Sequence, residues 1–170
     1  MKKSLRFIAV LLILGLTIPA IAQTNAKFGY IDSNELIELM PGKDSVEAKL
    51  AEYQKNLERQ IEDMIIEYQN KVQDYQANLA TMSDIIRQTK EKEITDLEQR
   101  IQTFQQNAEL DFQNKQAELY NPLIEKAKRA ISEVAEENGY TYIFDAGVGI
   151  LLYYEKGVYI LPMVRAKLGL

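Results

Sequence analysis

VEAKLAEYQKNLERQIEDMIIEYQNKVQDYQANL, at residues 46–79, decides the fold. Apolar or tyrosine side chains stand eleven residues apart in it, with others four and seven residues after each. They are Val46, Leu50, Tyr53, Leu57, Ile61, Met64, Tyr68, Val72, Tyr75 and Leu79. An eleven-residue period is about 3.67 residues per turn, so this pattern predicts a long helix that is nearly straight or coils slightly right-handed.

The same spacing returns in the second half of the chain. Its apolar members are Leu97, Ile101, Phe104, Ala108, Phe112, Leu119, Leu123, Ala130 and Val134, while Lys115 and Lys126 interrupt it. A single helix of more than 90 residues is the alternative to a hairpin, because no glycine or proline lies between Gly42 and Pro122. Residues 80–84 are the best turn, with Ser83 or Asp84 as the N-cap of the second helix.

The positions of the helix breakers favour the hairpin. If the chain folds back near residue 83, Pro41 and Gly42 lie level with residues 124–125, close to Pro122. A proline inside a helix costs about 3 kcal/mol and kinks it. Helix breakers at the same level of both helices predict a hinge between an arm and a body. The hinge residues are Pro41, Gly42 and Pro122.

The ends of the chain have a different, β-rich pattern. We expect strands at 27–32, 140–145 and 148–154, a short pairing segment at 158–160, and helices at 34–40 and 162–168. Ser33 is the expected N-cap of the first short helix, and Asp44 or Ser45 that of the first long helix. The fold class is therefore α+β and mainly α, with an arm at 43–121 inserted into a discontinuous body at 23–42 and 122–170.

The predicted strands do not make a complete sheet on their own. Three short strands leave two unpaired edges, which invite pairing with another chain, and a symmetric ring of chains can close such edges into a barrel. We therefore expect an oligomer whose β-barrel is shared between subunits. Its candidate body residues are Phe28, Tyr30, Ile31, Tyr142, Ile143, Phe144, Ile150 and Leu152.

Residues 1–22 have the pattern of a bacterial secretory signal peptide. Lys2, Lys3 and Arg6 precede an apolar stretch, and Ala20-Ile21-Ala22 is a small-x-small cleavage pattern. We expect cleavage after Ala22 and a periplasmic mature chain, the alternative being an uncleaved anchor. Removing the three basic residues changes the formal charge from −5 to −8.

The composition excludes several classes of function. The net negative charge argues against nucleic-acid binding. The chain has no cysteine and no histidine, so it lacks disulfides, the commonest general base and the commonest metal ligand. Gly147-x-Gly149 is only half of a nucleotide loop, and no helix pattern follows it. We expect no enzyme activity, no catalytic or metal site and no cofactor.

The order of these features resembles the Skp (OmpH) family of periplasmic chaperones. The similar stretches are 28–32 (FGYID), 119–124 (LYNPLI) leading into 130–131, and 139–146 (GYTYIFDA). The resemblance implies a homotrimer with a β-barrel body, and three tentacle-like arms around a cavity that holds unfolded outer-membrane proteins without ATP. The family's best-known members are strongly basic. This chain is acidic, so we do not expect electrostatic capture, lipopolysaccharide binding or membrane contact. Tyr159 and Leu161 stand where many relatives carry a helix-capping Asp-x-Thr pattern.

Five apolar residues outside the eleven-residue pattern are candidate client contacts. Ile66 lies two residues after Met64, about 200° around the helix, and Leu110 is related in the same way to Ala108. The other candidates, Met82, Ile85 and Ile86, are near the predicted turn. Exposed aliphatic side chains can mark a contact surface. The alternative function is a structural coiled-coil spacer or adaptor of the cell envelope that binds one folded partner.

Overall fold

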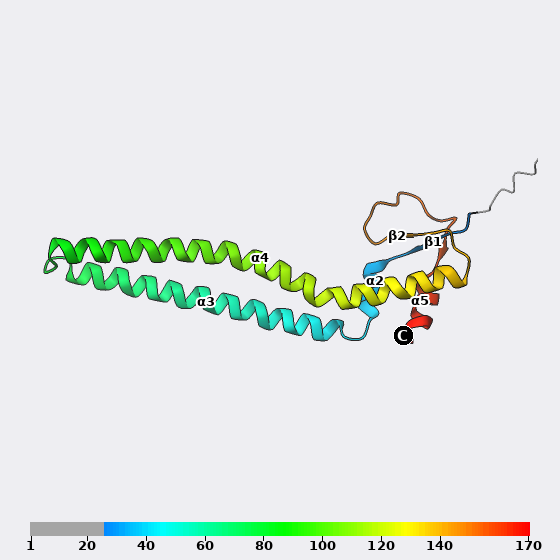
Figure 1. The fold of residues 1–170 in the computed structure, drawn as a ribbon, viewed down its shortest axis with the longest axis horizontal. Coiled ribbons are helices and arrows are strands. Elements are labelled where there is room, and N and C mark those ends of the chain that lie inside the picture. The colour runs from blue at the N-terminus through cyan, green and yellow to red at the C-terminus, as the bar shows by residue number, and fades with distance from the viewer. Residues whose placement is uncertain (1–25) are drawn as a thin grey trace, which may run out of the picture.

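The computed structural model describes residues 26–170, so the predicted signal peptide lies outside the described residues. A long arm of two helices projects from a small α+β body (Figure 1). The elements are β1 (Phe28–Ile31), α2 (Ser33–Leu39), α3 (Lys43–Asn78), α4 (Asp84–Glu137), β2 (Tyr142–Asp145), β3 (Val158–Tyr159) and α5 (Leu161–Leu168). The predicted α+β, mainly helical class with a long antiparallel hairpin is confirmed.

The arm is a hairpin and not one continuous helix. The Tyr53 hydroxyl of α3 donates a hydrogen bond to Asp111 of α4, and the Tyr75 hydroxyl donates to Glu91 at 2.5 Å. These pairs place the fold-back near residue 83, as the sequence predicts. The apolar and tyrosine residues of the eleven-residue pattern are buried or half-buried except Leu79 near the tip. They form the seam between α3 and α4.

Two helix ends in the arm follow the predicted signals. Ser83 is the N-cap of α4, and its hydroxyl accepts a hydrogen bond from the Ile86 backbone N–H at 3.4 Å. Helix α4 ends at Glu137, and Gly139 follows with φ of +67°, a left-handed conformation that suits glycine.

Two predicted caps are wrong. Helix α3 begins directly after Gly42, whose φ is +100° and which offers no side-chain cap, so neither Asp44 nor Ser45 has that role. The cap of α2 is Asp32, whose carboxylate accepts from two backbone N–H groups. Ser33 already lies in the first turn of α2 and bonds to β2 instead.

The start of α3 lies beside the part of α4 that follows Pro122. Gly42 lies beside Leu123, since a Cβ on Gly42 would be 3.7 Å from that side chain. Helix α4 continues through Pro122 from the arm into the body. Lys43 Nζ contacts Glu38 of α2 and Glu47 of α3 at 2.8 Å each. Its hydrogen bonds to these two carboxylates raise the pKa of Lys43, and the bond to Glu38 has the larger effect.

The sheet joins the two ends of the chain. Its strand order is β2-β1-β3, and both outer strands run parallel to β1. Phe28 pairs with Tyr142, and Gly29 pairs with Ile143 and Val158. Along the chain, the arm therefore lies between the central strand, β1, and β2, which pairs with it.

The predicted strand at 148–154 is absent, and this prediction is wrong. Gly147 lies so close to Asp32 that a Cβ there would collide with the Asp32 carboxylate, and its carbonyl accepts from Asn34 at 3.0 Å. These contacts turn the chain towards α2 instead of back along β2. Residues 146–157 then form a loop that leaves the sheet before it returns at β3 (Figure 1).

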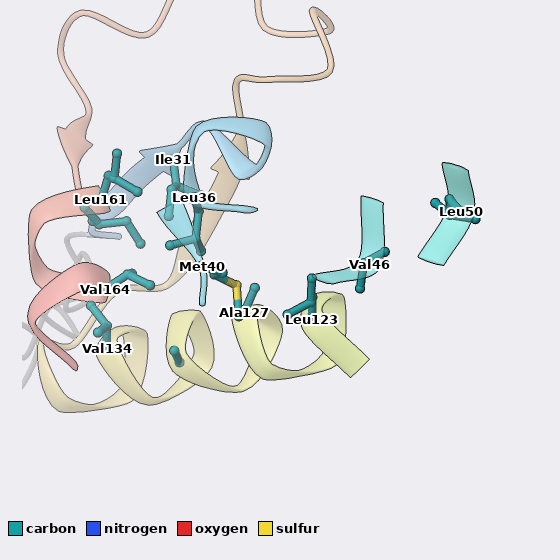
Figure 2. Packing of buried hydrophobic residues seen from close by; sticks show 12 residues of the cluster. Ile31, Leu36, Met40, Val46, Leu50, Leu123, Ala127, Val134, Leu161 and Val164 are labelled. Carbon is teal, nitrogen blue, oxygen red and sulfur yellow. The ribbon is translucent and has the colours of Figure 1, made fainter. Parts of the chain in front are cut away.

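The core lies between the inner face of the sheet and the helices of the body. Ile31, Leu36, Ile160 and Val164 are fully buried. Figure 2 shows α5, α2 and β1 converging on one side of α4, with Ala127 and Val134 facing them. Helix α5 has no side-chain N-cap, and it is held by packing and by Pro162 in its first turn.

Candidate functional site

The aliphatic candidates on the arm are exposed but separate. Ile66 on α3 is exposed, and so is Leu110 on α4. The cross-helix pairs place Ile66 level with about residue 100, some ten residues along α4 from Leu110. Each therefore belongs to its own part of the arm surface.

The candidates near the turn do gather. Ile85 and Ile86 are exposed, at 78% and 50%, beside the half-buried Met82 and the exposed Leu79. These four residues, here called the tip cluster, form an apolar end to an otherwise polar arm. Arg87 lies in the next turn and approaches Asp84 to 3.7 Å.

Four of the candidate body residues form a largely exposed aromatic face on the sheet. Phe28 stacks on Tyr142 with ring centres 6.1 Å apart, and Phe144 is also 6.1 Å from Phe28. Tyr30 lies against Tyr154 at 4.7 Å. The aromatic face, which comprises Phe28, Tyr30, Tyr142 and Phe144, is exposed or half-buried along its length.

Two other candidate body residues lie on the opposite side of the sheet. Ile31 is 2% exposed and belongs to the core, and Ile143 is half-buried against it. They support the sheet from within their own chain, so they are not free to meet a second copy.

The remaining body candidates lie on the loop at 146–157. Ile150 is 77% exposed and Leu152 is 98% exposed. The same loop brings Leu151 and Tyr153 over the aromatic face, where they and Tyr30 line a cavity of about 400 Å³. The sequence pattern identified this segment as apolar, but it did not show that Tyr153 and Tyr154 fold back over the sheet.

A polar cluster that the sequence analysis missed fastens the loop to the body. The Asp145 carboxylate accepts hydrogen bonds from the Ser33 hydroxyl at 2.5 Å, the Ser33 backbone N–H at 3.1 Å and the Gly147 backbone N–H at 2.9 Å. The separation of 112 residues between Ser33 and Asp145 hid this contact. Only the strand register, which pairs Ile31 with Asp145, could have revealed it.

Tyr159 is a second tie between the sheet and α2. Its hydroxyl donates to Glu35 Oε2 at 2.6 Å. Partial burial, together with this hydrogen bond, raises the pKa of Tyr159 to about 12. The tie holds only while the phenol is protonated.

The described residues offer exposed contact surfaces. Within residues 26–170, no group of three or more acidic side chains is placed to hold a metal ion. None of the helices in this range is long and apolar enough to cross a membrane. The protein is thus an arm-bearing α+β protein whose exposed features are apolar and aromatic patches, which is the class expected for binding other polypeptides.

Comparison with known proteins narrows this class to a family. The family model described as outer membrane protein (OmpH-like) matches residues 27–168, and the chain belongs to this family. It is 27% identical over 133 residues to the chaperone protein Skp of Photorhabdus luminescens, covering 78% of this chain and 81% of that one. It is also 27% identical over 135 residues to the chaperone protein Skp of Pectobacterium atrosepticum, covering 78% and 82%.

A solved structure has the same fold. It is described as a putative outer membrane chaperone (OmpH-like) from Caulobacter crescentus. The TM-score is 0.68 at 12% identity, with 84% of this chain and 83% of that chain covered. The arm and body are therefore the shared architecture.

Proposed function

We propose that the protein is an ATP-independent holdase chaperone that keeps unfolded outer-membrane proteins from aggregating. The relatives described as chaperone protein Skp support this function. The sequence has no complete nucleotide-binding loop, so client release relies on the client folding or inserting elsewhere. The single observation that carries the proposal is the exposed apolar surface of body and arm, which one chain cannot cover by itself.

The body surface supports assembly into a homotrimer. Phe28, Tyr142 and Phe144 of the aromatic face and most of the apolar loop at 146–157 are exposed, although part of that loop lies over the face. The outer edge of β2 pairs with no strand of the described chain. Pairing between copies would satisfy such an edge, and closing a ring would leave none. A shared β-barrel would place the three arms around one cavity.

Client contacts on the arms would be weak and numerous. Ile66, Leu110 and the tip cluster each offer a small apolar surface. Binding at several such places on three arms gives high overall affinity through effective concentration, without one strong contact. Flexing at Pro41, Gly42 and Pro122 would fit the cavity to clients of different size.

The proposed site of action is the periplasm. The signal peptide pattern at residues 1–22 would direct export, with cleavage after Ala22. The name of the relatives and the family description fit such an envelope role.

The test is aggregation of an unfolded outer-membrane β-barrel protein diluted from urea. The mature chain is expected to keep it soluble at about one trimer per client, while an equal mass of albumin is not. A chain that leaves the aggregation rate unchanged contradicts the proposal. Replacing Ile66 and Leu110 with serine should weaken a holdase by degrees, whereas abrupt loss of binding to one folded partner would indicate the adaptor function.

A further inference from the structure

One face of α4 carries no charged side chain over a long run of exposed positions. Moving by three or four residues along the helix, seven successive exposed positions are uncharged. They are Gln99, Thr103, Gln106, Leu110, Gln113, Ala117 and Asn121. In a chain with 26% charged residues, such a run on a solvent-facing helix is unusual.

A groove runs beside this row, along one side of the seam. Its first part has a volume of about 840 Å³, with Met64 and Phe104 in its lining and Thr103 and Asn107 on the α4 side. Its second part, of about 360 Å³, shares Phe104 and Asn107 and continues to Leu110 and Asn114. We call the two parts together the arm groove, defined by Met64, Phe104, Asn107, Leu110 and Asn114.

The amide groups in the arm groove are available for a ligand. Among the hydrogen bonds of residues 26–170, none uses the side chain of Asn107 or of Asn114. By contrast, Asp111 in the same groove accepts from Tyr53, and Asp96 at its far end is held by Lys92 at 2.7 Å. Asp63 and Arg100 also line the first part of the groove, whereas Asp111, which Tyr53 engages, is the charged residue in the lining of the second part. The second part, around Asn107 and Asn114, is therefore where the amides lie clear of unpaired charge.

We propose that the arm groove binds an extended segment of an unfolded polypeptide through its peptide groups, an inference that rests on the holdase function proposed above. Asparagine and glutamine side chains both donate and accept, as peptide N–H and C=O groups do, so they can pair with any backbone whatever its sequence. Phe104, Met64 and Leu110 add apolar contacts for alternate side chains of the segment.

The uncharged row, with Asn107 and Asn114 in the groove beside it, would let an acidic chain take up clients of either sign. The arm as a whole is acidic, so a client segment rich in carboxylates would be repelled elsewhere on it. At Asn107 and Asn114 there is no charge on the client-facing side chain to repel it. A second arm is a poorer occupant, because a packed helix needs apolar residues at most positions of the row, and only Leu110 and Ala117 meet that need.

Photo-crosslinking locates the contact. A benzophenone side chain is placed at Asn107, or at Asn70 on the outer face of α3 as a control, in the mature full-length chain. The probe is a labelled, unfolded outer-membrane β-barrel polypeptide diluted from urea. We expect crosslinks to the probe from position 107 and few from position 70. Equal crosslinking at both positions, or crosslinks from position 107 to a second copy, would overturn the proposal.

Matched variants test the chemistry of the contact. Asn107→Asp with Asn114→Asp adds two negative charges to the groove, and Asn70→Asp with Gln73→Glu adds the same charge to the outer face of α3. We expect roughly tenfold weaker binding of the probe for the first pair and less than twofold change for the second. Asn107→Leu with Asn114→Leu should also weaken binding, and tighter binding would overturn amide recognition.

Failure of this proposal can be told from failure of the proposed function. If the unmodified chain keeps the probe soluble but the groove variants bind it equally well, the arm groove is excluded and the holdase remains. If the unmodified chain does not keep the probe soluble, both are excluded. Thermal unfolding of each variant checks that these exposed substitutions leave the fold intact.

Discussion

Single side chains tie the sheet to helix α2 from two directions. Asp145 receives the Ser33 hydroxyl and backbone N–H at the end of β2, and Tyr159 of β3 reaches Glu35. Both ties join residues more than a hundred positions apart, so they form only when the two ends of the chain have met. The stability of the body therefore depends in part on these two ties, which change with the protonation of Asp145 and Tyr159.

At this scale we predict an alkaline loss of stability that depends on Tyr159. Its pKa is about 12 in the folded protein against 10.0 for an ordinary tyrosine. A raised folded pKa gives stability that is complete below pH 10 and is lost as the pH rises towards 12. Chemical unfolding of the wild type should show a falling free energy across this range, and Tyr159→Phe should flatten the fall.

The flattening should be partial, because hydrogen bonds to Asp111 and Glu91 also raise the pKa values of Tyr53 and Tyr75. Tyr68→Phe is the control, since its side chain has no hydrogen bond among the described residues. Equal slopes for Tyr159→Phe and the wild type would contradict the assigned tie.

Helix caps show what sequence can and cannot predict for single residues. The sequence left Ser83 and Asp84 as alternative caps of α4, and the structure shows Ser83 in that role. At α2, Asp32 and Ser33 are adjacent, and both residue types are good caps. Asp32 is the cap because the Ser33 side chain is hydrogen-bonded to Asp145. That partner is distant in sequence, so local rules cannot include it.

At the scale of the elements, the arm is held by a narrow seam that sequence periodicity predicted well. A repeat of eleven residues depends only on neighbours along the helix, and it identified the inner faces of both α3 and α4. Away from the body most seam residues are half-buried, and Leu97 and Ala108 are the buried exceptions. Few residues therefore determine the stability of the arm.

We predict that Leu97→Ala loosens the arm. This side chain is 2% exposed, and removing it leaves a cavity between the helices that costs about 2–5 kcal/mol. Ile66→Ala removes a similar side chain from the exposed face and should change the free energy of unfolding by no more than about 0.5 kcal/mol. Hydrogen exchange should quicken in α3 and α4 for Leu97→Ala alone.

Helix α4 also carries the predicted hinge at Pro122, which should widen the range of arm positions. An interior proline costs about 3 kcal/mol relative to alanine, because it removes a backbone hydrogen bond and crowds the preceding turn. We expect Pro122→Ala to raise the unfolding temperature and to narrow the distribution of distances between tip and body.

Spin labels provide that measurement, since the natural chain has no cysteine. Cysteines at Thr81 and Glu136, both exposed, would carry the labels, with labelled chains diluted into unlabelled ones. A distribution equally broad with proline and with alanine would place the flexibility elsewhere, for example at Gly42.

The segment at 148–154 shows where element prediction fails. Its apolar residues are typical of a strand, but a strand also needs a neighbouring edge and a layer to cover it. The outer edge of β2 is free in the single chain, but Gly147 turns the backbone towards α2, so the segment does not pair with that edge. The segment is apolar, as a strand would be, but the strand conformation predicted from this pattern is wrong.

At the scale of the whole molecule, the core between the helices and the sheet is buried, but the other face of the sheet is largely exposed. The inner face of the sheet is buried, while the aromatic face and the loop residues Ile150 and Leu152 face solvent. Large exposed apolar patches often mark sites where another chain binds. No rule based on one chain could say how these residues are covered, because their partners would lie in other chains.

We therefore predict that the mature protein in solution has the mass of three chains. Light scattering measures this mass directly. The double variant Ile150→Asp with Leu152→Asp should shift the mass towards a single chain, because an unpaired carboxylate buried at an interface is costly. Ile85→Asp at the arm tip is the matched control: its side chain is equally apolar and 78% exposed, but it lies at the far end of the arm from the body (Figure 1). That variant should keep the full mass. A wild-type chain that stays monomeric and folded at micromolar concentration would contradict assembly through the body, and the arms could not then enclose a shared cavity.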